Sequence, residues 1–264
     1  MRSCVQPGKG YAMFWGQRAI KLTGLVLLLL ASAVIIDAVL ETAILGDADP
    51  FDRGDTEGIL LDINDNESLF FIGSGIAVVA DGFALLATAG MLWLVFRDRS
   101  PVLAVLGLVG LMAASAAFLI SDAGYVTTAL LAADFVEEGG PAGIPAGDPA
   151  TLQAARAVMA FSALADLLGL LVLALGLIAF GSVVAWAPEG AVNPPRWLGF
   201  LGIASSVALL STWTIVFEEY VGWTAGGIGI LGTLLFVLIL GGWLLSRPDE
   251  GRVPAASKPL AEAI

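Results

Sequence analysis

The chain has 264 residues, of which 58% are hydrophobic and 14% charged, with 24 acidic against 12 basic side chains. Apolar runs of about 20 residues with charges gathered between them indicate a polytopic membrane protein. The acidic balance argues against nucleic acid as a partner, and the lack of histidine excludes His-ligated haem, zinc and di-iron centres and Ser-His catalysis.

The apolar runs predict an all-α bundle of six transmembrane helices that forms one membrane domain over residues 1–246. We expect the spans at about 19–45, 68–96, 101–130, 155–186, 196–219 and 224–246. Spans three and four exceed the length that a bilayer requires, so their outer ends are expected to project as a short hairpin. Residues 247–264 are polar and predict a disordered cytoplasmic tail.

Basic residues predict the orientation of the bundle. Arg53 and Arg156 fall on one side, and all the others fall on the opposite side: Arg2, Lys9, Arg18, Lys21, Arg97, Arg99, Arg196, Arg247, Arg252 and Lys258. Because cytoplasmic loops are enriched in Lys and Arg, both termini are expected in the cytoplasm, with the protein in the plasma membrane of a bacterial or archaeal cell. The acidic segment 46–68 then lies outside.

The first apolar run also has features of a secretory signal, with a small-residue cleavage site at Ala33. The run continues through "VIIDAVLETAIL", which is longer than a signal core. We therefore expect the N-terminal helix to be retained. The single cysteine, Cys4, lies before this run, so disulfides within the chain and thiolate metal sites are excluded.

Acidic residues recur inside the predicted spans. A charged side chain in hydrocarbon costs at least ~2.5–3.5 kcal/mol, so these acids should face the bundle interior or a hydrated cavity, or be protonated. Small or polar neighbours at helical spacing also favour faces that pack against other helices. The candidate ligand or ion site consists of Asp81, Asp166, Asp37, Glu41, Asp122 and Glu218.

Asp81 and Asp166 are the expected core of this site, because they lie deepest and occupy matching places in a faint repeat, "VADGFALL" and "LADLLGLL". Carboxylates without His or Cys favour protons, Na⁺, Ca²⁺ or Mg²⁺. The alternative is that each acid bonds a neighbour or reaches the outer water and serves only packing. For Glu41, Asp122, Glu218 and Glu219, near the interface, this alternative is preferred.

Two other patterns are weaker. The outer loop has oxygen ligands at calcium-like spacing, but Phe51 occupies the third ligand position counted from Asp47, so an ordinary solvated acidic loop is expected. The segment "GGIGILG", residues 226–232, has small-residue spacing for close helix contact, within the chain or with another subunit.

The segments "RAIKLTGLVLLLLASAVIIDAVLE", "ADLLGLLVLALGLIAFGSVVAW" and "PPRWLGFLGIASSVALL" resemble a family of uncharacterised bacterial multi-span membrane proteins, catalogued as a domain of unknown function. The resemblance covers about two-thirds of the chain. Members often carry an Arg in the third span, where this chain has Asp122 and no Arg. The resemblance therefore implies a membrane protein and carries no activity or site residue to this chain.

Three functions stay open. The first is a small transporter that handles protons or cations through the inward carboxylates. The second is a non-catalytic membrane subunit or scaffold, and the third is a membrane-embedded enzyme acting on lipid, for which no nucleophile-base pair is evident. We expect no catalytic residues and no cofactor, and as partners the lipid bilayer with either a homo-oligomer or a membrane complex.

Overall fold

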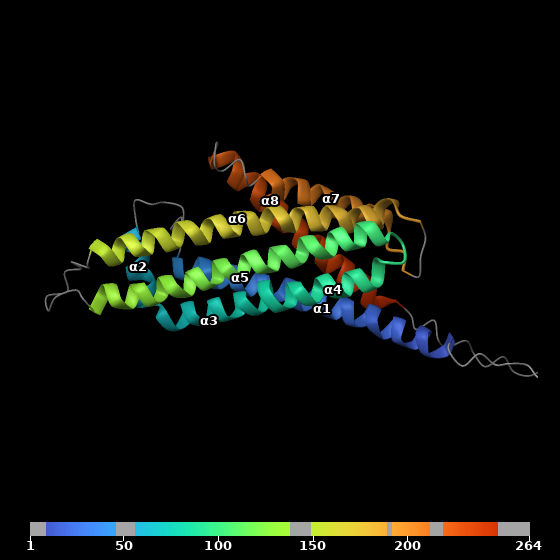
Figure 1. Ribbon diagram of the computed structural model, residues 1–264, viewed down its shortest axis with the longest axis horizontal. Helices are drawn as coiled ribbons and strands as arrows, with labels where there is room; N and C mark the ends of the chain where they lie inside the picture. The colour runs from blue at the N-terminus through green and yellow to red at the C-terminus, as the bar shows by residue number, and fades with distance from the viewer. Residues whose placement is uncertain (1–8, 46–55, 138–148, 189–191, 212–218, 248–264) are drawn as a thin grey trace, which may run out of the picture.

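The computed structural model describes residues 9–45, 56–137, 149–188, 192–211 and 219–247, and within these ranges every regular element is a helix (Figure 1). The helices lie roughly along one axis and form an elongated bundle. They are α1 (Lys9–Leu45), α2 (Thr56–Asp65), α3 (Glu67–Ala77), the π-helix η1 (Val78–Ala84), α4 (Leu85–Phe96), α5 (Pro101–Glu137), α6 (Pro149–Trp186), α7 (Arg196–Leu210) and α8 (Glu219–Ser246).

Five segments of the described chain are long and apolar enough to cross a bilayer: Arg18–Leu40, Glu67–Phe96, Pro101–Val136, Pro149–Trp186 and Gly227–Ser246. The predicted all-α membrane class is confirmed by these helices. The predicted fifth span, 196–219, corresponds to the 15-residue helix α7, while residues 212–218 and the tail from 248 lie outside the described ranges. The structure thus gives five candidate spans and one shorter apolar helix.

Proline marks where several helices begin. The first residue of α5 is Pro101, that of α6 is Pro149, and α7 follows Pro195, which has an extended backbone with φ −55° and ψ 133°. A proline fits the first turn of a helix because its missing N–H has no partner there in any case. The short connections before α5 and α7 then turn the chain back along the bundle.

The end of α5 and the beginning of α6 are covered by α2, which the sequence analysis did not predict. With 37 and 38 residues, α5 and α6 are each about 55 Å long and exceed the bilayer core. On α2, Ile59, Leu60 and Ile63 are buried against a cluster that includes Phe135 of α5 and Met159 of α6. We call this cluster the α2 cluster.

Glycines allow the long helices to approach closely. A Cβ atom at Gly110 of α5 would lie 2.6 Å from the Cα atom of Gly176 in α6, so the two backbones meet there. On α8, a Cβ atom at Gly229 would lie 2.5 Å from the backbone nitrogen of Leu209 in α7. The glycine-rich segment of the last predicted span therefore makes at least one of its close contacts within the chain, as small residues do between membrane helices.

Basic and aromatic residues gather at one end of the bundle, which we call the basic end. The guanidinium carbon of Arg97 lies 5.0 Å from the ring centre of Trp93, and that of Arg247 lies 4.8 Å from Trp243. The ends of α4, α6 and α8 meet here (Figure 1). Aromatic rings beside cationic groups are typical of a membrane–water interface.

Arg99 ties two connections together at the basic end. Its Nε atom donates a 2.9 Å hydrogen bond to the carbonyl oxygen of Pro188, and its Nη2 atom donates one of 2.9 Å to that of Ala187. These carbonyls follow the last turn of α6, where a cation also offsets the negative end of the helix dipole. Arg99 thereby holds the α4–α5 connection against the end of α6.

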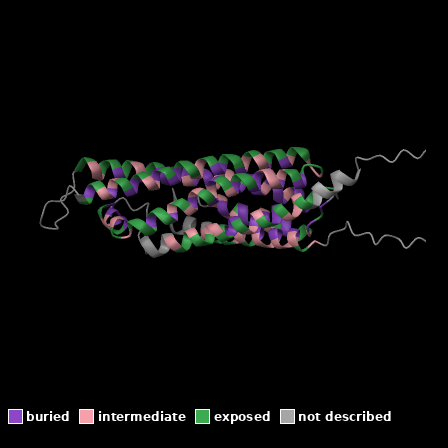
Figure 2. Cartoon of the chain, turned by 90° about the horizontal axis from the view of Figure 1, so that it is seen from below, coloured by how far each residue is buried: buried purple, intermediate pink, exposed green. Residues whose placement is uncertain are grey.

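Burial follows the faces that the helices turn toward one another, while exposed residues follow the outward faces over the length of the bundle (Figure 2). The outward residues are largely apolar, as on Val102, Phe83 and Leu231, whose side chains are all more than 60% exposed. Exposed apolar faces on this scale suit contact with lipid.

Candidate functional site

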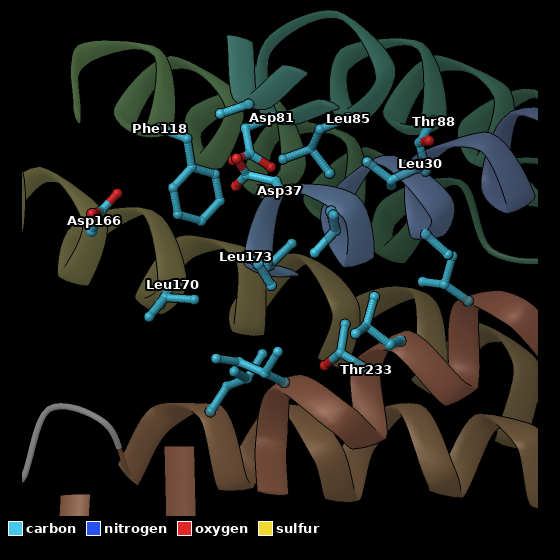
Figure 3. Close-up of a pocket in the computed structure, with 18 of the residues that line it drawn as sticks. Leu30, Asp37, Asp81, Leu85, Thr88, Phe118, Asp166, Leu170, Leu173 and Thr233 are labelled. Carbon is cyan, nitrogen blue, oxygen red and sulfur yellow. The ribbon is translucent and has the colours of Figure 1, made fainter. Parts of the chain in front are cut away.

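Four aspartates line one cavity of about 560 Å³ inside the bundle. Asp37 comes from α1, Asp81 from η1, Asp122 from α5 and Asp166 from α6, so each belongs to a different element. Figure 3 shows Asp37 and Asp81 close together, with Phe118 beside them and Asp166 further along the same space. We call this space the acidic cavity.

The local backbone around Asp81 is unusual. Asp81 lies in the middle of η1, where the helix widens to a π-helix between α3 and α4. The next residue, Gly82, accepts a 2.9 Å hydrogen bond at its carbonyl oxygen from the buried hydroxyl of Ser115 in α5. Short π-helical segments inside α-helices occur frequently at functional sites, because the widened turn changes the direction of a side chain.

Asp166 has an aromatic partner. The hydroxyl of Tyr125 in α5 donates a 3.3 Å hydrogen bond to the Oδ2 atom of Asp166, and both residues line the acidic cavity. Tyr125 is three residues after Asp122, so the two share one face of α5. Asp122 is therefore a second cavity carboxylate on the side of α5 from which Tyr125 bonds Asp166.

Asp122 is buried, and one of its carboxylate oxygens accepts no hydrogen bond from the described residues. Its side chain is 6% exposed, and its Oδ2 atom has no hydrogen-bond partner among the described residues. The hydroxyl of Thr88, which is 2% exposed, and the hydroxyl of Thr233 in α8 also have no hydrogen-bond partner among the described residues. All three residues line the acidic cavity. Buried polar groups without partners are costly, so these atoms are suited to a ligand, an ion or water.

The described residues that line the cavity include no lysine or arginine. Asp81 repels both Asp37 and Asp166 electrostatically, and Asp122 also lies within range of all three. Arg156 in α6 places its Nε atom 3.4 Å from the hydroxyl oxygen of Thr56 in α2. The described lining of the acidic cavity therefore combines four carboxylates with no basic side chain.

The aspartates are spread around the wall of the cavity. Within the described ranges, no three carboxylates come close enough together to hold a single metal ion. A compact calcium or magnesium centre needs at least several oxygens at 2.0–2.6 Å from the ion. The arrangement instead offers separate carboxylates along a larger space.

Most of the remaining wall is apolar. Leu30, Leu85, Leu170 and Leu173 line it together with the ring of Phe118 (Figure 3). Leucine side chains from three helices and a phenylalanine ring from a fourth thus line a volume that one inorganic ion would not fill. Such a combination of apolar wall and few polar groups is typical of small-molecule pockets.

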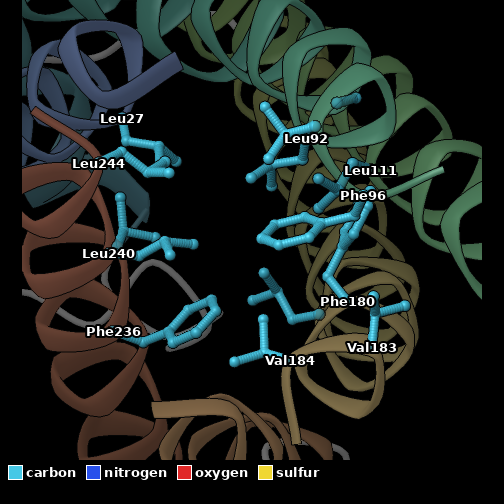
Figure 4. Packing of buried hydrophobic residues seen from close by; sticks show 14 of the residues in the cluster. Leu27, Leu92, Phe96, Leu111, Phe180, Val183, Val184, Phe236, Leu240 and Leu244 are labelled. Atoms are coloured by element: carbon cyan, nitrogen blue, oxygen red, sulfur yellow. The ribbon is translucent and has the colours of Figure 1, made fainter. Parts of the chain in front are cut away.

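A cluster of buried apolar side chains lies between the acidic cavity and the basic end. Figure 4 shows its two facing groups, one that includes Leu240 and Leu244 of α8 and one that includes Phe96 of α4 and Phe180 of α6. Leu92 and Leu177 line the cavity, while Phe96 and Phe180 lie about one helical turn closer to the basic end and are at most 1% exposed. On α8, Leu240 and Leu244 continue the packing in the same direction. We call this cluster the basic-end core, and it closes the cavity on that side.

The structure thus brings together four of the six acids of the predicted site: Asp37, Asp81, Asp122 and Asp166. Glu41 lies in α1, one turn after Asp37, and Glu218 lies outside the described residues. For Asp122 the preferred interpretation was solvation or a bond to a neighbour, whereas the structure buries it with an unpartnered oxygen. The burial of Asp122 was missed because it depends on the other helices that enclose the acidic cavity, which the sequence of α5 alone does not show.

Four polar cavity residues were not included in the predicted site: Ser74, Thr88, Tyr125 and Thr233. Ser74 and Thr88 lie seven residues before and after Asp81, so helical spacing already places them on its face. Tyr125, three residues after Asp122, could have been inferred in the same way. Thr233 lies on the one predicted span without an acid, so no local signal in the sequence pointed to it.

Comparisons with known proteins give the family of the chain without adding an activity. No curated protein and no solved structure shows significant similarity to the chain. The family model described as a domain of unknown function, DUF4386, matches residues 22–247, a range that includes all four aspartates of the acidic cavity, so the chain belongs to this family.

Proposed function

We propose that this protein is a membrane transporter that binds a cation in the acidic cavity and exchanges it for protons. The observation that carries the proposal is the placement of four aspartates from four elements around one cavity whose described lining has no basic side chain. Transporters commonly place ionisable residues inside the bundle in this way, since lipid does not tolerate them on the outer faces.

Charge balance supports the exchange. Four carboxylates that repel one another across a mainly apolar space cannot all be ionised without a counter-charge. Arrival of a cation therefore favours release of protons, and departure of the cation favours their return. Protons and the cation neutralise the same carboxylates. Binding of one therefore weakens binding of the other.

The proposed topology has six spans, with α7 and the residues after it forming the fifth, and both termini in the cytoplasm. The basic end then faces the cytoplasm, in agreement with the enrichment of Lys and Arg in cytoplasmic loops. The basic-end core blocks passage toward that side, so a transport cycle requires α1 and α8 to separate from α4 and α6 there. Alternating access of this kind is usual for secondary transporters.

The test is proton movement in proteoliposomes that contain the purified protein and an internal pH-sensitive dye. Gradients of Na⁺, K⁺, Ca²⁺ and tetraphenylphosphonium are applied separately. We expect at least one cation to change the internal pH, and Asp81→Asn and Asp122→Asn to abolish the change.

The matched control is Asp134→Asn, which removes an exposed carboxylate of the same helix as Asp122. It should retain the response of the unchanged protein. If no cation moves protons, or if the cavity variants respond as the control does, the transporter proposal is wrong and an accessory-subunit role becomes the better explanation.

A further inference from the structure

We infer that the ligand of the acidic cavity is an organic cation with an apolar body, such as a quaternary ammonium, a phosphonium or an amphipathic amine. The inference rests on the proposed function, because it names the class of cation that the transporter takes. It follows from the size of the cavity, the chemistry of its wall and the spacing of its carboxylates.

The size of the cavity favours a molecule over a bare ion. At about 560 Å³, the cavity falls within the roughly 300–1,000 Å³ that is typical of pockets for drug-sized ligands. An inorganic ion would need water to fill the remainder, and most of the residues that line the wall are apolar and give such water no partner. An apolar body fills this space without that cost.

The wall has an acidic part and an apolar part. Figure 3 shows Asp37 and Asp81 on one wall and Leu170 and Leu173, from α6, across the space from them. A cationic head beside the aspartates would leave an attached hydrocarbon body against the leucines. Burial of apolar surface contributes about 25 cal/mol per Å², so the apolar part can supply much of the affinity.

Aromatic rings add a further site for an organic cation. Four aromatic residues line the cavity: Phe70, Phe118, Tyr125 and Phe236. Phe118 lies beside Asp37 and Asp81 (Figure 3), and the hydroxyl of Tyr125 donates to Asp166. The faces of such rings attract quaternary ammonium groups, which have no N–H to donate and are therefore poorly served by carboxylates alone. Rings and carboxylates together suit a large, diffuse positive charge.

Two buried polar atoms point to a ligand independently of the acidic cluster. The hydroxyl of Thr88 is 2% exposed and has no partner among the described residues, although it lines the cavity. The Oδ2 atom of Asp122 is in the same situation. The separation of the carboxylates adds to this, because no three of them within the described chain could close around one metal ion.

The experiment compares two ions of nearly the same size and shape and of opposite charge. Tetraphenylphosphonium and tetraphenylborate are titrated separately into the full chain in lipid nanodiscs, and empty nanodiscs are subtracted to remove binding to lipid. We expect saturable binding of the phosphonium alone. Asp81→Asn and Asp122→Asn should weaken it at least about tenfold each.

A second pair of variants tests the apolar wall. Leu173→Trp fills part of the cavity and should weaken phosphonium binding at least about tenfold, whereas Leu175→Trp, on the 52% exposed face of the same helix, should not. Size-exclusion chromatography checks that both variants stay folded. If Leu173→Trp misfolds, the smaller change Leu170→Phe replaces it, with the same expectation.

The outcomes separate this inference from the proposed function. If Na⁺ or Ca²⁺ moves protons in proteoliposomes while phosphonium neither binds nor moves protons, the transporter proposal holds and the organic ligand is wrong. Equal saturable binding of phosphonium and borate would show that the acids do not select the ligand, and would also overturn the inference. Phosphonium binding that depends on Asp81, Asp122 and Leu173 supports it.

Discussion

The hydroxyl of Ser115 in α5 donates a hydrogen bond of 2.9 Å to the carbonyl oxygen of Gly82 in η1. Gly82 directly follows Asp81, and a Cβ atom at Gly82 would lie 2.5 Å from a methyl carbon of Leu119 in α5. The π-helix is therefore held against α5 by one buried hydrogen bond and one close contact. Together they fix the backbone that directs Asp81 toward the acidic cavity.

Replacing Ser115 by alanine should loosen this contact. Loss of the donor leaves the buried Gly82 carbonyl with one partner fewer, and we expect the free energy of unfolding to fall by about 1–3 kcal/mol. Thermal unfolding in detergent measures the change. Thr127→Ala is the control, because Thr127 is exposed on α5 and donates only to Ala123 of its own helix. Equal stability of the two variants would show that the Ser115 contact does not hold η1.

Asp122 should behave in the opposite way. A buried carboxylate with an unpartnered oxygen destabilises the fold, so Asp122→Asn or Asp122→Leu should leave the free energy of unfolding unchanged or raise it by about 1–3 kcal/mol. The same variants should lose cation binding. A gain in stability with a loss of binding is typical of functional residues.

The measurements are thermal unfolding and the phosphonium titration on the same preparations. If Asp122→Asn instead fails to accumulate in the membrane, or unfolds at a clearly lower temperature than Asp134→Asn, then Asp122 has a structural role and the alternative of packing alone is correct for this residue.

The boundaries of the membrane helices follow closely from the sequence. The second span, expected at 68–96, corresponds to Glu67–Phe96, and the third begins at Pro101 as expected. Apolar length and proline set these limits locally. The third helix continues beyond residue 130 to Glu137 and packs in the α2 cluster, in line with the expected projection of the long helices.

Features that depend on contacts between helices could not be predicted in this way. No residue type in Val78–Ala84 signals a π-helix, and the contacts of Gly82 with Ser115 and Leu119 join residues that are far apart in the sequence. Helix α2 is different, because its buried Ile59, Leu60 and Ile63 already show amphipathic spacing in the sequence. The acids of the cavity could be predicted because a charged side chain in a membrane helix must avoid lipid. The hydroxyl of Thr233 has no charge, so its position in the helix does not predict which way it faces.

The orientation of the bundle can be tested with single cysteines. In a Cys4→Ser background, Asp65→Cys at the end of α2 should react with a membrane-impermeant maleimide on intact cells. Asp98→Cys, in the exposed α4–α5 connection at the basic end, should react only after the membrane is permeabilised. The expectation follows from the enrichment of Lys and Arg in the cytoplasmic loops of membrane proteins. Labelling of both positions from the same side would contradict the proposed topology.

Two glycines provide a matched test of helix packing. At Gly110, a Cβ atom would lie 2.6 Å from the Cα atom and 2.8 Å from the nitrogen of Gly176, and these backbone atoms cannot move aside without shifting α6. At Gly90 of α4, a Cβ atom would meet nothing within 4 Å. Gly110→Ala should therefore lower the free energy of unfolding by about 1–3 kcal/mol, and Gly90→Ala should raise it by about 0.5–1 kcal/mol.

Gly110→Ala should also weaken ligand binding, because α5 carries Asp122 and Tyr125 while α6 carries Asp166, and separation of the helices stretches the hydrogen bond between Tyr125 and Asp166. Thermal unfolding and the phosphonium titration on both variants measure the two effects. If Gly110→Ala is as stable as Gly90→Ala, then α5 and α6 do not meet at the glycine pair. If it is unstable but binds normally, then the distance between Tyr125 and Asp166 does not control the acidic cavity.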